Sequence, residues 1–316
     1  MIGNTVVTGL GIAADGLNGA ADLLRVEPAR TGPAAFDPAP LIGGRGLRYK
    51  DRATKLALLA GGYALEQAGL SGRADGAEPD ETTGVVVSSN FGNLDTVCRV
   101  AQVIRAEGVR GTSPMDLPNA SSNVIASSVA IRFGLRGPNL MVCNGAASGL
   151  DAVYWATVLI GCGRVLRVLV IGVETSNPTV VALAGRLFDG AAALVLESEE
   201  SADARGIKAL AAVGGYARRA SGAESNAAAL AADGGPAGIG LVCAGADRPR
   251  PEGGEQAGSC DLDWLLGPSS GALGALQSLA GVAWLQAGGQ GAVLATAGDD
   301  ADGSATLVLR AARGSR

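Results

Sequence analysis

The 316-residue sequence contains no histidine, only three lysines and few aromatic residues (3%). The missing histidine excludes imidazole as a general base, as a metal ligand and as the middle member of a serine–histidine triad. The five cysteines contain no CxxC pair and are odd in number, so neither a zinc site nor a disulfide framework is indicated. We therefore expect no bound metal and a reducing, cytoplasmic compartment.

Positive charge and long apolar segments are also scarce. The net charge is −5, which is the opposite of the basic field that binds nucleic-acid phosphates. No uncharged run of about 18 apolar residues occurs, and the run 165–173 is both short and interrupted by Arg167. The turn Gly9-Leu10-Gly11 lacks the third glycine and the acidic residue of a dinucleotide fingerprint. We expect no nucleic-acid partner, no membrane segment and no cofactor.

What the sequence has in abundance is apolar side chains, at 47% of residues. Short apolar runs alternate with longer alanine-rich stretches, and strands that are apolar on both faces must be covered on both sides. This pattern predicts a layered α/β fold. Predicted strands lie at 5–8, 83–88, 140–143, 165–172, 191–196, 207–216, 238–242, 291–295 and 304–309. Predicted helices lie at 50–67, 93–107, 121–133, 147–161 and 271–286, and a turn inside a hairpin is expected at 202–206.

The order of these elements recurs in reduced form, which predicts two related halves at 1–190 and 191–316 within a single compact unit. Four separated segments then resemble one family, the β-ketoacyl synthases of the thiolase superfamily. They are the opening strand and turn 6–11, the segment 135–149, the strand 189–197 and the helix start 271–278. The resemblance implies a thiolase-like layered αβαβα fold.

The catalytic positions of that family are all changed in this sequence. By the spacing of the motifs, the family's cysteine falls on Ala146 and its two histidines fall on Ala244 and Pro268. The lysine before the second histidine falls on Asp263. Condensation needs a thiolate to carry the acyl chain and donors that polarise a thioester carbonyl. We therefore expect no catalytic residue at these degenerate positions.

The resemblance to an inactive copy implies a chain length factor, the ketosynthase-like subunit of type II polyketide synthases. Such a subunit is expected to form a heterodimer with an active ketosynthase, to shape a tunnel for the polyketide or polyene chain, and to work with an acyl carrier protein. The strand 140–143 is expected to pair across the dimer. The candidate tunnel or interface residues are Met115, Asn119, Ser122, Asn123, Leu140, Met141, Val142 and Cys143.

Two alternatives stay open. Cys143 lies three residues before the expected nucleophile and could make the chain an acyltransferase or condensing enzyme, although its position in an apolar run predicts a buried, inert thiol. The chain could also be a structural or carrier-docking subunit, with a basic patch drawn from Arg99, Arg105, Arg110 and Arg132.

Polar residues near the degenerate site have simpler expected roles. No base is available to activate a serine there. We expect Ser148 and Ser270 to cap a helix or a turn, and Asp189 and Asp263 to hold turns rather than to act as acids.

Overall fold

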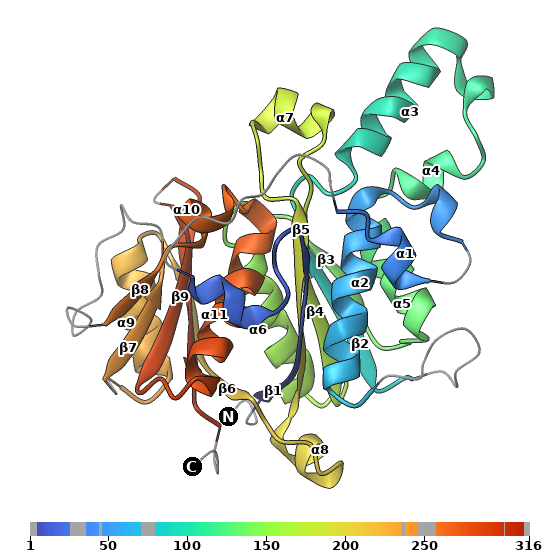
Figure 1. The fold of residues 1–316 in the computed structure, drawn as a ribbon. Helices are drawn as coiled ribbons and strands as arrows, with labels where there is room; N and C mark the ends of the chain where they lie inside the picture. The colour runs from blue at the N-terminus through green and yellow to red at the C-terminus, as the bar shows by residue number, and fades with distance from the viewer. Residues whose placement is uncertain are drawn as a thin grey trace.

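A computed structural model describes residues 5–25, 36–43, 46–70, 80–235, 238–244, 257–299 and 301–312. Within them the strands form one ten-stranded mixed sheet in the order β3-β2-β4-β5-β1-β6-β10-β9-β7-β8 (Figure 1). The strands are β1 (Thr5–Ala14), β2 (Thr83–Ser88), β3 (Asn139–Val142), β4 (Arg167–Glu174), β5 (Gly190–Ser198), β6 (Ala211–Arg219), β7 (Ile239–Cys243), β8 (Gly258–Cys260), β9 (Ala292–Asp299) and β10 (Gly303–Arg310).

The sheet consists of two halves that repeat one topology. Strand β1 pairs with β5 along its length but meets β6 only through Thr5–Val7, so the sheet divides there. On each side, two parallel pairings are followed by an antiparallel one: β3-β2-β4-β5 in the first half and β8-β7-β9-β10 in the second. Strand β5 belongs to the first half by this pairing, and the division of the chain at 190/191 stays a prediction.

Helices cover both outer faces of the sheet and fill the space between its halves. The long helices are α2 (Arg52–Gln67), α3 (Leu94–Glu107), α5 (Val124–Phe133), α6 (Ser148–Gly161), α9 (Gly222–Ala232) and α11 (Leu273–Gln286). Helices α6 and α11 contact strands of both halves, while α2 and α5 cover the first half and α9 covers the second (Figure 1). The αβαβα order of layers is therefore confirmed.

Shorter helices occupy the connections. They are α1 (Ala39–Ile42), α4 (Asp116–Asn119), α7 (Pro178–Ala184), α8 (Glu199–Ala204) and α10 (Leu262–Leu266), with 3₁₀ turns η1 (Ala20–Leu24), η2 (Leu47–Tyr49), η3 (Val109–Gly111) and η4 (Ser270–Ala272). The expected hairpin at 202–206 is wrong, because β1 lies between β5 and β6 and α8 precedes the turn. Among the described helices, none has the length and apolar character needed to cross a bilayer.

The two central helices touch backbone to backbone where they begin. A Cβ atom on Gly149 would lie 2.7 Å from the backbone nitrogen of Gly274, and one on Gly274 would lie 2.2 Å from that of Leu150. Contacts this short exclude any side chain at either position. The close approach places the start of α6 beside the start of α11, and the turns that lead into these helices carry Ala146 and Pro268.

Candidate functional site

The turn between β3 and α6 keeps an ordered shape around Ala146. The hydroxyl of Ser148 accepts a hydrogen bond from the backbone N–H of Asn144 (2.9 Å) and donates to the carbonyl of Gly145 (2.6 Å). Ser148 is fully buried and Ala146 is partly buried. Ser148 thus holds the strand-to-helix turn, and Ala146 contributes only a methyl group to it.

Asn90, which follows β2, joins this turn to the segment after Pro268. Its side-chain nitrogen donates to the carbonyl of Gly145 (3.0 Å) and to the hydroxyl of Ser270 (2.8 Å). Ser270 has a φ of +43°, a left-handed conformation that is unusual for any residue other than glycine. The structure therefore brings the turns of Ala146 and Pro268 to one place, and an amide occupies the junction.

Glu174, the last residue of β4, lies buried beneath the same junction. One carboxylate oxygen accepts from the backbone N–H groups of Asn90 (2.7 Å) and Gly271 (3.0 Å). The other accepts from Phe91 N–H (3.1 Å) and the Ser89 hydroxyl (3.2 Å). Burial raises the pKa of Glu174 to about 7, against these four donors, which lower it. With all its oxygens engaged, this carboxyl organises the loops rather than facing a substrate.

Ala244, which the resemblance aligns with the family's first histidine, directly follows β7 in the other half of the sheet. The carbonyl of the preceding residue, Cys243, accepts a hydrogen bond from the side chain of Gln277 on α11 (3.0 Å). The carbonyl of Pro268 accepts from the backbone N–H of Phe188 (2.8 Å). Alanine and proline at these positions supply neither a proton donor nor a base.

A buried carboxylate ties the β3–α6 turn to the second half of the sheet. Asp151, in the first turn of α6, accepts hydrogen bonds from the Asn144 side chain, the Tyr216 hydroxyl and Arg218, the last at 2.5 Å. Tyr216 also stacks on Tyr154 at 4.3 Å between ring centroids. This network joins α6 to β6 and, through Asn144, to the β3–α6 turn.

Cys143 is not where the sequence predicts it. Strand β3 ends at Val142, its residues are partly exposed, and the Cys143 side chain is exposed rather than buried. The strand is the edge of the sheet, so its apolar residues have a neighbouring strand on one side only. Partial desolvation and the negative charge of Glu174 raise the pKa of the Cys143 thiol. A thiol whose pKa is raised is a poor nucleophile at neutral pH.

Four tunnel candidates, Met115, Asn119, Ser122 and Asn123, lie around α4 and the start of α5, beside the projecting helix α3 (Figure 1). Asn119 is buried, and its amide donates to the carbonyls of Tyr49 (3.1 Å) and Met115 (2.9 Å). Met115, Ser122 and Asn123 are exposed. Helix α5 begins at Val124, so Ser122 and Asn123 lie in the turn before it rather than in the predicted helix.

Asp189 and Asp263, which the sequence predicts to hold turns, both have structural partners. Asp189 forms a two-pronged ion pair with Arg52 (2.7 and 2.9 Å), and Asp263 accepts from the backbone N–H of Ser269 (2.9 Å). Sequence analysis missed Asn90, Glu174 and Asp151. Of these, only Glu174 could have been noticed in the sequence. It is a charged residue at the carboxyl end of an apolar strand, and binding sites in α/β sheets form at the carboxyl ends of the strands.

Comparison with known proteins matches the fold and the family. The model of the β-ketoacyl synthase N-terminal domain matches residues 31–195. The chain is 28% identical over 209 residues to 3-oxoacyl-[acyl-carrier-protein] synthase 2 of Vibrio cholerae, covering 57% of this chain and 50% of that protein. It is 30% identical over 272 residues to a granaticin polyketide putative beta-ketoacyl synthase 1 of Streptomyces violaceoruber, covering 69% of this chain and 64% of the relative. It spans about half the length of several curated relatives.

Solved structures share the fold over almost the whole chain. The ishigamide ketosynthase/chain length factor matches with a TM-score of 0.81 at 19% identity, covering 98% of this chain and 99% of that one. A type II polyketide synthase acyl carrier protein in complex with its ketosynthase matches at 0.75 and 16% identity, over 99% of this chain and 100% of that one. At such low identity these likenesses show the fold alone. The family model spans about half of the chain and decides the family: this protein belongs to the β-ketoacyl synthase family.

Proposed function

We propose that this protein is a non-catalytic chain length factor, which pairs with an active ketosynthase and forms part of the tunnel for a growing polyketide or polyene chain. The observation that carries the proposal is the turn at Ala146. Hydrogen bonds from Ser148 and Asn90 keep the strand-to-helix geometry of a nucleophile turn. The residue at the position of the nucleophile, however, is an alanine, which carries only a methyl group. A subunit that contributes only walls needs this scaffold and not its chemistry.

The open edge at β3 supports a heterodimer. The carbonyls of Pro138 and Val142 accept hydrogen bonds from Val85 of β2 and from Ser89, which directly follows β2. Because backbone groups alternate in direction along a strand, those of Asn139 and Met141 point away from β2. An apolar edge strand with free backbone groups is a template for another strand. A partner that adds a strand here would join two sheets into one.

Exposed apolar residues on the segments around α3 also support a partner. Helices α3 and α7 pack against each other, and α4 contacts α3 (Figure 1). On and beside them, Val109 is 67% exposed, Leu183 65% and Leu117 57%. Exposed large apolar side chains on a projecting part of a protein are consistent with an interface.

The proposal is tested by co-expression with a ketosynthase that retains its cysteine and both histidines. We expect the two chains to co-purify, and we expect polyketide products of defined length only from the pair. Replacing Ser122 or Asn123 by Trp is expected to shorten the product, because both side chains are exposed here and open to a partner-lined tunnel. Asn119 is a poor test site, since its buried amide holds α4 to Tyr49.

A matched control is Glu107→Trp, at the exposed end of α3. It should leave the product length unchanged. Unchanged lengths in both Ser122→Trp and Asn123→Trp would remove these residues from the tunnel, and failure of the chain to bind the ketosynthase would contradict the proposed function itself.

The exposure of Cys143 favours one alternative, an acyltransferase or condensing enzyme that uses this thiol. Its raised pKa weighs against that role. The carrier-docking alternative loses part of its basic patch, because Arg99 is paired with Asp116 (2.9 Å) and Arg132 donates to the carbonyl of Gly43 (3.2 Å). Docking of an acidic carrier protein on the heterodimer then depends mainly on Arg105, Arg110 and the ketosynthase.

A further inference from the structure

The second half of the sheet holds two cysteines side by side, away from the degenerate site. Cys243 ends β7 and Cys260 ends β8, and the two residues are in register across these parallel strands. In-register residues of neighbouring strands have Cα atoms about 4.8 Å apart and side chains on the same face. That separation lies within the range of about 4.4–6.8 Å that a disulfide bond spans. The spacing of the two strands is therefore compatible with a disulfide bond between these residues.

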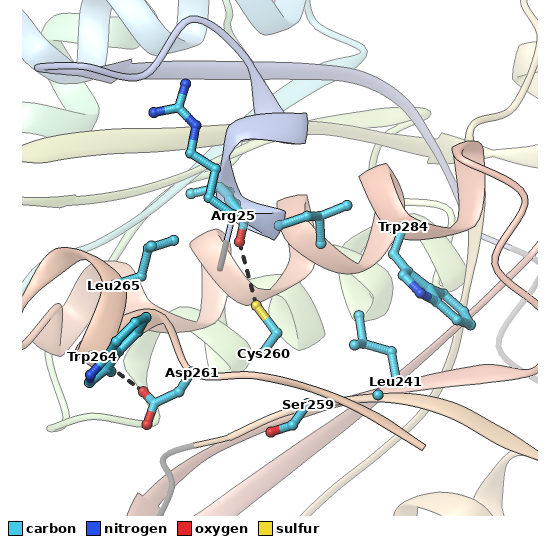
Figure 2. Close-up of a pocket in the computed structure, with 11 residues that line it drawn as sticks. Arg25, Leu241, Ser259, Cys260, Asp261, Trp264, Leu265 and Trp284 are labelled. Atoms are coloured by element: carbon cyan, nitrogen blue, oxygen red, sulfur yellow. Dashed lines mark hydrogen bonds between the residues drawn. The ribbon is translucent and has the colours of Figure 1, made fainter. Parts of the chain in front are cut away.

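A cavity of about 600 Å³ gives access to one of these thiols (Figure 2). Cys260 is partly buried and lines the cavity with Leu23, Leu241, Trp264 and Trp284, whereas Cys243 is fully buried behind it. Figure 2 shows the Cys260 side chain between the two indoles, with its sulfur directed at the Leu23 carbonyl (3.6 Å). Two of the three tryptophans in the sequence line this one cavity.

The two thiols differ in acidity as well as in access. A hydrogen bond from the Cys243 thiol lowers the pKa of Cys260, despite the opposing effect of burial. The same bond, together with complete burial, raises the pKa of Cys243. An accessible thiol with a lowered pKa beside a second thiol is the arrangement found where cysteines undergo reversible oxidation.

We propose that Cys243 and Cys260 form a dithiol oxidation site, in which Cys260 reacts first with a hydroperoxide and Cys243 then closes a disulfide bond. In the first step the Cys260 thiolate takes an oxygen atom from the peroxide, so the O–O bond breaks and a sulfenic acid and an alcohol or water form. In the second step the Cys243 sulfur attacks the sulfenic sulfur and water leaves. Each sulfur is oxidised by one electron, and the peroxide is reduced by two.

The disulfide would tie β8, a three-residue edge strand, covalently to β7. The carbonyl of Cys243 is held by Gln277 of α11, so the link would also connect the edge of the sheet to the central helix layer. Strand β8 leads directly into α10 and the Pro268 turn. Oxidation is therefore expected to stiffen this end of the molecule without involving the β3 edge.

The test treats the intact protein with hydrogen peroxide, blocks the remaining thiols with iodoacetamide, and maps the cysteines by mass spectrometry without reduction. Trypsin would leave both cysteines in one fragment, because Arg248 and Arg250 precede prolines. A glutamyl endopeptidase cuts after Glu252 and Glu255 and separates them. We expect a Cys243–Cys260 linkage to form before Cys162, which is exposed, is oxidised.

Three variants sharpen the test. Cys243→Ser should leave Cys260 as a sulfenic acid that dimedone traps, whereas Cys260→Ser should leave Cys243 as a free thiol. Cys162→Ser is the matched control and should leave the linkage unchanged. The proposal is overturned if, in the unsubstituted protein, both thiols stay alkylated at peroxide doses that oxidise Cys162, or if Cys260 pairs with a different cysteine.

Discussion

The two edge strands of the sheet, β3 and β8, have the same pairing topology, but β3 is apolar and β8 is polar. Strands β3 and β8 each pair in parallel with the second strand of their half, and each leads to a cysteine and then toward a central helix. The β3 edge reads Asn-Leu-Met-Val and is followed by the exposed Cys143. The β8 edge reads Gly-Ser-Cys and ends at Cys260, which lines a cavity.

The difference shows how one repeated fold assigns different tasks to its edges. A short polar strand discourages pairing with other chains, whereas an apolar one invites it. The thiols follow the same division, because the pKa of Cys143 is raised by partial burial and Glu174 while that of Cys260 is lowered by Cys243. Under the two proposals, association belongs to the β3 edge and redox chemistry to the β8 edge.

The largest effect is expected from breaking the β3 edge with Met141→Pro. The N–H of Met141 points away from β2, so proline removes a group that a partner strand would bind and spares the bonds to β2. Association with the ketosynthase should weaken by about 100-fold or more, which corresponds to about 3 kcal/mol. Titration calorimetry of the purified pair measures this change.

The matched control lies on the opposite edge. Ser259→Lys places a charge on β8, where Ser259 is exposed. It should leave ketosynthase binding within about twofold, a difference of less than 0.5 kcal/mol by the usual conversion. Equal weakening by both substitutions, or tight binding by Met141→Pro, would remove the distinction between the edges.

A second prediction concerns the network that fixes the turn after β3. Asp151→Ala leaves Tyr216 and Arg218 without their shared acceptor, and breaking such a buried pair should lower the free energy of unfolding by about 3 kcal/mol. Denaturant unfolding of the isolated chain measures it. The control is Asp189→Ala, whose pair with Arg52 is about 30% exposed and should cost about 1 kcal/mol. Equal losses would show that burial does not set the strength of these pairs.

A third prediction is that the free energy of unfolding depends on pH through Glu174, the last residue of β4. The pKa of Glu174 is about 7 in the folded chain against an ordinary 4.5, so the folded state keeps a proton that the unfolded chain releases between these values. The free energy of unfolding should therefore fall as pH rises from 4.5 through 7. Denaturation at pH 5 and pH 7.5 measures this slope, which Glu174→Gln should flatten.

Glu174→Gln should also lower stability at both pH values by roughly 1–3 kcal/mol, because an amide nitrogen would face backbone N–H donors. Asp51→Asn is the comparison variant for the slope of stability with pH, because burial also raises the pKa of the Asp51 carboxyl, at the start of α2. A slope that persists unchanged in Glu174→Gln would assign the pH dependence to other groups.

The smallest effect is expected from Cys143→Ala. Under the proposed function this thiol is a surface group beside the interface, so product formation by the reconstituted pair should stay within about twofold of the unsubstituted pair. Assay of product yield at saturating carrier protein measures it. A loss of more than about tenfold would support the alternative that Cys143 is the nucleophile. It would also contradict the distinction between an unreactive Cys143 and a reactive Cys260.

Much of the fold could be predicted because strands that are buried on both faces form unbroken apolar runs. The runs of β2, β4 and β5 were visible in the sequence, whereas β8 is too short and polar to have a pattern. The hairpin at 202–206 was wrong because β1 enters between β5 and β6 from the far end of the chain. Local sequence carries no signal for such a pairing.

The site was only half predictable, for a similar reason. The spacing of the motifs located Ala146 and Pro268, and the structure brings their turns together. Asn90 and Asp151 could not be identified, because their roles depend on side chains more than 50 residues away in sequence. The exposure of Cys143 was missed because an apolar run does not reveal whether its strand lies at the centre or at the edge of a sheet.

The central claim, that this chain retains the scaffold of a condensing enzyme without its chemistry, is tested most directly by acyl loading. The chain and its ketosynthase are incubated, together and separately, with a radiolabelled acyl thioester on the carrier protein, and the label is located by gel and by mass spectrometry. We predict label on the ketosynthase cysteine alone and none on this chain in any mixture. Covalent label on this chain in the absence of the ketosynthase, at Cys143 or at any other residue, would contradict the account.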